Sequence, residues 1–85
     1  MARREEFKME RRELLDIVKP GAVFSVAEYS LPNSWYYVLG HAYAMSANFT
    51  SLDRIQSREG KVIEVLDTPK GYFVTVEFEE PAKEV

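Results

Sequence analysis

The chain has 85 residues, a net charge of −3 and a hydrophobic share of 46%, as expected for one soluble globular domain spanning residues 1–85. The negative charge argues against nucleic acid as a partner, because phosphate contacts usually require an excess of basic residues. There is no cysteine and only one histidine, His41, so disulfides, thiolate metal sites and multi-histidine zinc sites are excluded. We therefore predict no cofactor and no metal.

The hydropathy of the chain predicts no membrane contact, and the missing cysteine fits the reducing cytoplasm as its location. No apolar run approaches the roughly 20 residues that are needed to cross a bilayer. The amino end has basic residues but lacks the apolar core of a secretory signal.

Residues 4–18 are predicted to form a helix. Phe7, Leu14 and Val18 fall close together on a helical wheel, and charged residues fill the positions between them. Charge pairs along this segment do not stabilise it, so its apolar stripe must dock on another element or on a copy of itself. The Pro-Gly pair at 20–21 ends the helix.

After Gly21 the apolar residues alternate, which predicts a strand over residues 22–30 and a turn over 31–34. The aromatic stretch 35–45 is predicted to be a second, long strand. Its bulky face would carry Trp35, Tyr37, Leu39, His41, Tyr43 and Met45, and its thin face Tyr36, Val38, Gly40, Ala42 and Ala44.

The aromatic side chains of this region allow three interpretations. They line the core of a small barrel, they form an exposed groove for an extended or Pro-rich peptide, or they form a surface for self-association. The candidate partner-binding residues for the second interpretation are Trp35, Tyr37 and Tyr43, joined by Tyr29 and Tyr72.

The carboxyl half predicts a hairpin whose register follows from its turn. Residues 68–71 (Thr-Pro-Lys-Gly) have the composition of a four-residue loop, in which Gly71 tolerates a positive φ. The strands 61–67 and 72–79 would then pair Val65 with Val74, Ile63 with Val76, Glu64 with Thr75 and Leu66 with Phe73.

A second loop at 58–60, with Gly60 in the left-handed region, would add a strand over 52–57 and complete a three-strand meander. Ile55 would then lie opposite Ile63, and Arg54 opposite Glu64. The alternative is a short helix, because Leu52 and Ile55 are three residues apart. Residues 80–85 are predicted to be a polar tail.

The predicted fold is α+β: an N-terminal helix followed by a small antiparallel five-strand barrel or sheet that resembles the Src-homology-3 kind. Residues 58–78, REGKVIEVLDTPKGYFVTVEF, also resemble a KOW-type segment. This resemblance implies contact with RNA or the translation machinery. A candidate basic patch for such contact consists of Arg54, Arg58, Lys61 and Lys70.

The sequence favours a non-catalytic role. Asp53, Glu28 and Glu64 are scattered carboxylates, and no phosphate loop, nucleophile motif or metal spacing is present. The leading hypothesis is a protein- or peptide-binding module that uses the aromatic-rich strand. The alternatives are a KOW-like nucleic-acid or ribosome-associated adaptor, which the acidic composition disfavours, and a homo-oligomeric structural subunit.

Overall fold

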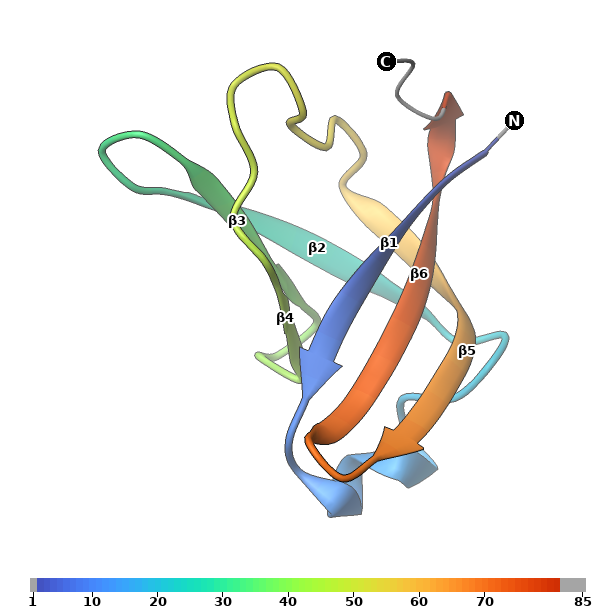
Figure 1. Ribbon diagram of the computed structural model, residues 1–85. Helices are drawn as coiled ribbons and strands as arrows, with labels where there is room; N and C mark the ends of the chain where they lie inside the picture. The colour runs from blue at the N-terminus through green and yellow to red at the C-terminus, as the bar shows by residue number, and fades with distance from the viewer. Residues whose placement is uncertain (1, 82–85) are drawn as a thin grey trace.

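The computed structural model describes residues 2–81, and its strands close into an antiparallel barrel (Figure 1). The order around the barrel is β1-β4-β3-β2-β5-β6, and β6 pairs back onto β1. The strands are β1 (Ala2–Met9), β2 (Val23–Ser30), β3 (Trp35–Leu39), β4 (Ala44–Ser46), β5 (Glu59–Thr68) and β6 (Gly71–Pro81).

This architecture overturns the predicted α+β fold. Within residues 2–81 the only helical segment is the short 3-10 helix η1 (Arg12–Asp16), and the sheet has six strands instead of five. The chain is thus a small all-β barrel, and the Src-homology-3-like arrangement of a helix and five strands is not supported.

The predicted helix over residues 4–18 is wrong because β1 has a period of two. Arg3, Glu5, Phe7 and Met9 point into the barrel, while the residues between them face solvent. Two of these inward positions are charged, which hides the strand pattern in the sequence. The two charges neutralise one another, with Arg3 Nε 2.6 Å from a carboxylate oxygen of Glu5.

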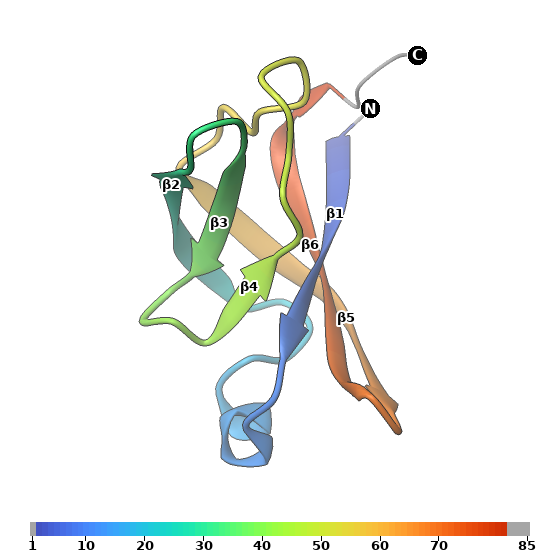
Figure 2. The same ribbon diagram turned by 60° about the vertical axis from the view of Figure 1, so that its left-hand side comes forward.

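The apolar residues that suggested a helical stripe serve another purpose. Leu14 of η1 and Val18 are buried in the same core as Phe7. Figures 1 and 2 show η1 at the end of the barrel where the β5–β6 hairpin turns. The segment between β1 and β2 therefore covers that end of the barrel.

The single strand predicted over 35–45 is two strands joined by a tight turn. Gly40 has a φ of 57° and Ala42 a φ of 62°, and the amide of Tyr43 donates to the carbonyl of Leu39 at 2.9 Å. A Cβ at Gly40 would lie 2.7 Å from the Tyr43 ring, so this position requires glycine. The predicted bulky face therefore ends at Leu39, and Met45 points out of the barrel.

Residues 47–58 form a loop, and neither the strand predicted over 52–57 nor the alternative short helix is present. Phe49 still makes an isolated bridge with Trp35. Ile55 is buried as expected, but it packs into the core from the loop and does not pair with Ile63. Arg54 likewise does not face Glu64.

The hairpin of β5 and β6 is confirmed, including the pairs Val65–Val74, Glu64–Thr75 and Leu66–Phe73. Gly71 has the expected positive φ, 119°. The predicted pair of Ile63 with Val76 is wrong, because a bulge between Val62 and Glu64 places Val62 opposite Val76.

Gly60 lies within β5 and does not adopt the predicted left-handed conformation. A side chain at Gly60 would collide with Val76 and Phe78, the latter at 2.9 Å, so glycine is needed there for close packing. Glu80 and Pro81, predicted to begin the tail, belong to β6, and the remainder of the predicted tail lies outside the described residues.

Buried residues from every strand fill the barrel. The fully buried side chains are Tyr37, Phe7, Phe78, Met9, Leu39, Val18, Val62, Val74 and Val76. Among residues 2–81, no helix is long and apolar enough to cross a membrane.

Candidate protein-interaction surface

The outside of β2, β3 and β4 carries a continuous row of uncharged side chains. Val26, Tyr37 and Ala44 are buried inside the barrel, so their neighbours along each strand point outward. The register places Ala27 beside Val38, Val38 beside Met45, and Tyr29 beside Tyr36. We call Ala27, Tyr29, Tyr36, Val38 and Met45 the outer apolar face.

This face leaves large apolar side chains in contact with solvent. Tyr29 is 48% exposed and Met45 is 50% exposed. The rings of Tyr29 and Tyr36 stack, with centroids 5.4 Å apart and planes inclined by 17°. Because the stacked rings hold one another in place, a partner that covers them removes little further side-chain entropy.

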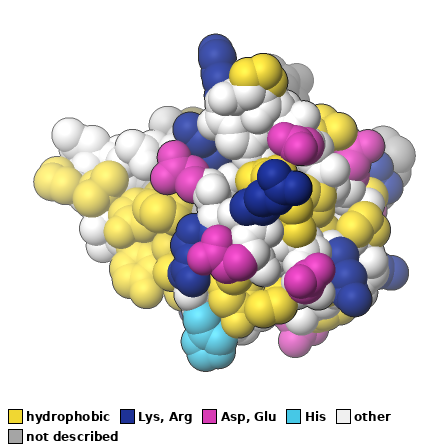
Figure 3. Space-filling view, turned by 90° about the horizontal axis from the view of Figure 1, so that it is seen from below, with side chains coloured by type: hydrophobic (Ala, Val, Ile, Leu, Met, Phe, Trp, Pro, Cys, Tyr) yellow, Lys and Arg dark blue, Asp and Glu magenta, His cyan; other side chains and the backbone are white. Residues whose placement is uncertain are grey.

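The space-filling view shows hydrophobic side chains gathered on the side of the barrel that carries the β2–β3 hairpin (Figure 3). Leu31, in the turn of that hairpin, is also 43% exposed. Apolar surface therefore continues from the sheet to the hairpin turn.

Two hollows flank Met45 where β4 meets β1. One has a volume of about 300 Å³ and includes Tyr43, and the other has about 280 Å³ and includes Phe73. Lys8 lines both hollows and lies opposite Met45 in the register. Charged residues of both signs also line these hollows, namely Glu6, Lys8, Glu10 and Arg11. The outer apolar face is thus bordered on this side by charged residues and by space for side chains of a partner.

Of the aromatic residues predicted to bind a partner, only Tyr29 lies on the outer apolar face. Tyr37 is 1% exposed and belongs to the core. Trp35, Tyr43 and Tyr72 are partly buried and pack against that core. The core interpretation therefore holds for Tyr37, and it is not part of the outer apolar face.

Sequence reasoning missed Tyr36, Val38 and Met45. Tyr36 and Val38 were placed on the thin face of one long strand, and Met45 was placed on the bulky face. The signal that could have found them is Gly40, because a turn at this glycine inverts the face on which the following residues lie.

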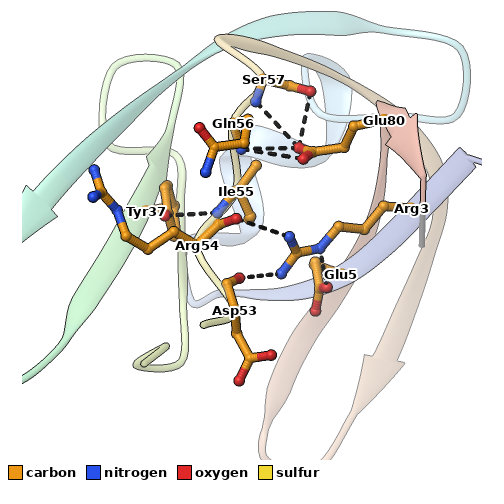
Figure 4. A network of polar contacts seen from close by, with 9 residues as sticks. All are labelled: Arg3, Glu5, Tyr37, Asp53, Arg54, Ile55, Gln56, Ser57 and Glu80. Carbon is orange, nitrogen blue, oxygen red and sulfur yellow. Dashed lines mark hydrogen bonds and ion pairs between the residues drawn. The ribbon is translucent and has the colours of Figure 1, made fainter. Parts of the chain in front are cut away.

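Behind the face, Tyr37 joins the core to a polar network (Figure 4). Its hydroxyl donates to Glu28 at 2.6 Å and accepts from the Ile55 amide at 2.8 Å. Arg54 binds both oxygens of the Glu28 carboxylate, at 3.0 and 2.6 Å, and its guanidinium lies 4.8 Å from the ring centroid of Trp35. Loop 47–58 is held to β2 and β3 by these contacts.

The network shifts the acidity of two of its members. Hydrogen bonds from Arg54 and then from Tyr37 hold the pKa of the Glu28 carboxyl below its ordinary value of 4.5. Burial, followed by the hydrogen bond to Glu28, raises the pKa of Tyr37 above its ordinary value of 10.0. Glu28 is therefore a structural anion at neutral pH.

A second cation holds the same loop to β1. Arg3 donates to the carbonyls of Asp53 and Arg54, and its guanidinium lies 5.6 Å from the ring centroid of Phe49 (Figure 4). This buried arginine is satisfied by loop carbonyls and by Glu5. At this end of the barrel, the paired charge of Arg3 thus occupies an inward position where an apolar side chain would usually pack.

The candidate basic residues do not gather into one patch. Arg54 is paired with Glu28, and Lys61 lies opposite Glu77 in the register. Lys70 sits in the turn between β5 and β6, at the end of the barrel away from loop 47–58. Arg58 is exposed at the end of loop 47–58.

Among residues 2–81, no group of three or more histidine or acidic side chains is arranged to hold a metal ion. His41 is exposed and makes an edge contact with Tyr43. No protein-family model matches the chain, and neither a curated protein nor a solved structure gives a significant match.

Proposed function

We propose that this small β-barrel is a protein-binding module and that the outer apolar face is its docking surface. The observation that carries the proposal is the exposure of Tyr29 and Met45 on either side of the partly buried Tyr36 and Val38. Contiguous apolar surface of this kind, bordered by polar residues, is typical of protein contact sites. Aromatic residues and methionine are enriched at such sites.

The geometry favours a folded partner over an extended peptide. The outer apolar face is the outside of a sheet, and the two hollows lie at its edge beside Met45. A partner surface of matching shape would cover the Tyr29–Tyr36 pair and place side chains into these hollows, where anchoring contacts contribute most of the binding energy. We therefore expect a partner whose contact surface has an apolar centre, for the Tyr29–Tyr36 pair and Met45, and a polar edge beside the charged residues that line the hollows.

Site-directed cross-linking tests this proposal. A photoreactive benzoylphenylalanine replaces Ala27, which is small and exposed and lies beside Val38 on the face. The matched control places the same residue at Glu64, which is exposed on β5 and outside the face. We expect a discrete cross-linked protein from position 27 only.

The captured protein supports the proposal only if it binds the barrel when purified. The Met45→Asp substitution in the barrel must also lower the affinity of this binding by about tenfold or more. Met45→Leu serves as the control, because it keeps the surface apolar. Equal products from both positions, or unchanged binding by Met45→Asp, would contradict the proposal.

A second copy of the chain is the other occupant that the same face could accept. The predicted helix that suggested self-association is absent, so the outer apolar face is the surface on which we propose that a second copy would pack. Sedimentation velocity at two concentrations tests this: a dimer that dissociates on dilution and is abolished by Met45→Asp identifies the partner as a second copy. A concentration-independent monomer assigns the face to a different protein.

A further inference from the structure

Loop 47–58 surrounds a carboxylate with hydrogen-bond donors. The Gln56 amide donates to the two oxygens of Glu80 at 3.0 and 3.2 Å (Figure 4). The Ser57 amide and hydroxyl both donate to Oε1 of Glu80, at 3.1 and 3.0 Å. Two residues therefore supply three donor groups to one oxyanion.

The donors are preorganised by the contacts of the adjacent residues. The amide of Ile55 donates to the hydroxyl of Tyr37, and the carbonyl of Arg54 accepts from Arg3. These contacts thus hold the loop backbone in place at the two residues just before Gln56. Successive backbone amides directed at one point form a concavity that binds anions.

Two exposed arginines, Arg54 and Arg58, flank residues 55–57. Arg54 binds the Glu28 carboxylate directly, and Arg58 also acts electrostatically on Glu28. The attraction of this site for an anion therefore rests on the backbone amides and the Ser57 hydroxyl.

Glu80 lies near the end of β6, beyond the part of that strand that pairs with β5. The register between β5 and β6 ends at Lys61 and Glu77, so Glu80 lies beyond the last paired residue of β6 on that side. Glu80 is half-buried, so the site opens to solvent. Backbone amides bind any oxyanion of suitable size, because they contact only its oxygens.

We propose that residues 55–57 form an oxyanion-binding site, which Glu80 fills in the free chain and which a carboxylate or phosphate group of a ligand occupies in its place. The tether gives Glu80 a high effective concentration, so an external ligand competes poorly while Glu80 is present. Removal of the Glu80 carboxylate should expose the site. This inference is independent of the outer apolar face.

The test is an NMR titration of Glu80→Ala with inorganic phosphate, and separately with acetate, at pH 7 and constant ionic strength set with sodium chloride. The Gln56 and Ser57 amides should shift and saturate at a phosphate or acetate concentration about tenfold or more below that needed by the unaltered chain. The matched control is Glu79→Ala, which removes a neighbouring exposed carboxylate and should behave as the unaltered chain. The relative strength of the two probes distinguishes a phosphate site from a carboxylate site.

Glu80→Gln provides a second variant that keeps a side-chain oxygen acceptor but removes the charge, and it should respond to the anions in the same direction. The proposal is overturned if neither variant shows saturable shifts, or if Glu79→Ala responds equally. It is also overturned if the loop amides disappear from the Glu80→Ala spectrum and phosphate does not restore them, because an exchangeable occupant requires the loop to keep its shape.

Discussion

Tyr37 illustrates how one side chain serves both the core and the polar network. Its ring is buried and packs edge-on against Phe49, with centroids 5.5 Å apart. Its hydroxyl satisfies the backbone amide of Ile55 and donates to Glu28. The aromatic core and the attachment of loop 47–58 therefore depend on the same residue.

We expect Tyr37→Phe to lower the free energy of unfolding by about 1–3 kcal/mol, because it leaves the buried Ile55 amide without its acceptor. Urea denaturation measures the loss. Tyr36→Phe, the adjacent substitution on the outer face, should change stability by no more than about 0.5 kcal/mol. Equal losses for the two variants would show that the Tyr37 hydroxyl has no structural role.

The carboxylate of Glu28 should make stability depend on pH on the acid side. Its pKa is lower in the folded chain than its ordinary value of 4.5, so ionised Glu28 stabilises the fold above that value. This contribution is lost as the pH falls from about 4.5 through the lowered pKa of the folded state. The difference in unfolding free energy between the unaltered chain and Glu28→Gln should accordingly be largest above pH 5 and shrink at lower pH. A difference that is constant with pH would contradict the assignment.

At the scale of the elements, the short turn between β3 and β4 determines which side chains form the outer apolar face. The turn needs a left-handed backbone at Gly40 and at Ala42. Glycine adopts this conformation readily, whereas alanine pays about 1–2 kcal/mol for it. The turn is thus strained at Ala42.

Ala42→Gly should therefore stabilise the barrel by about 0.5–1 kcal/mol, since the relief of strain exceeds the added entropy of the unfolded chain. Thermal unfolding gives the sign directly. Ala27→Gly, a substitution of the same size within β2, should destabilise the protein instead. A loss of stability in Ala42→Gly would show that Ala42 does not adopt the left-handed backbone conformation.

The elements differ in how far the sequence alone could predict them. The β5–β6 hairpin was predictable because its turn has a Pro-Lys-Gly signature and its strands alternate visibly. β1 was not, because Arg3 and Glu5 occupy inward positions that are normally apolar. Glu5, which pairs with Arg3, is only two residues away, but the loop carbonyls that also bind Arg3 come from a distant part of the chain.

The candidate sites were predictable only in part, for a related reason. Tyr29 could be identified as a candidate contact residue, but the outward direction of Met45 depends on Ala42 adopting a conformation that alanine rarely adopts. The donors to Glu80 could not be foreseen, because Gln56 and Ser57 bind it mainly through backbone groups that carry no sequence signal.

At the scale of the whole molecule, β1 closes the barrel between β4 and β6. It pairs with β6 along its whole length but with β4 only at Phe7 and Lys8. The short pairing of β1 with β4 places Met45 at the rim of the outer apolar face. The opposite end of β1 brings Arg3 beneath loop 47–58. Both proposed binding sites thus depend on β1 being a strand.

Nuclear Overhauser contacts from the backbone of Lys8 test this closure most directly. The barrel predicts cross-strand contacts from Lys8 to Met45 on one side and to Phe73 on the other. Contacts between residues three and four apart along residues 4–18, without cross-strand contacts to either partner, would instead indicate a helix and would contradict the barrel and both sites built on it.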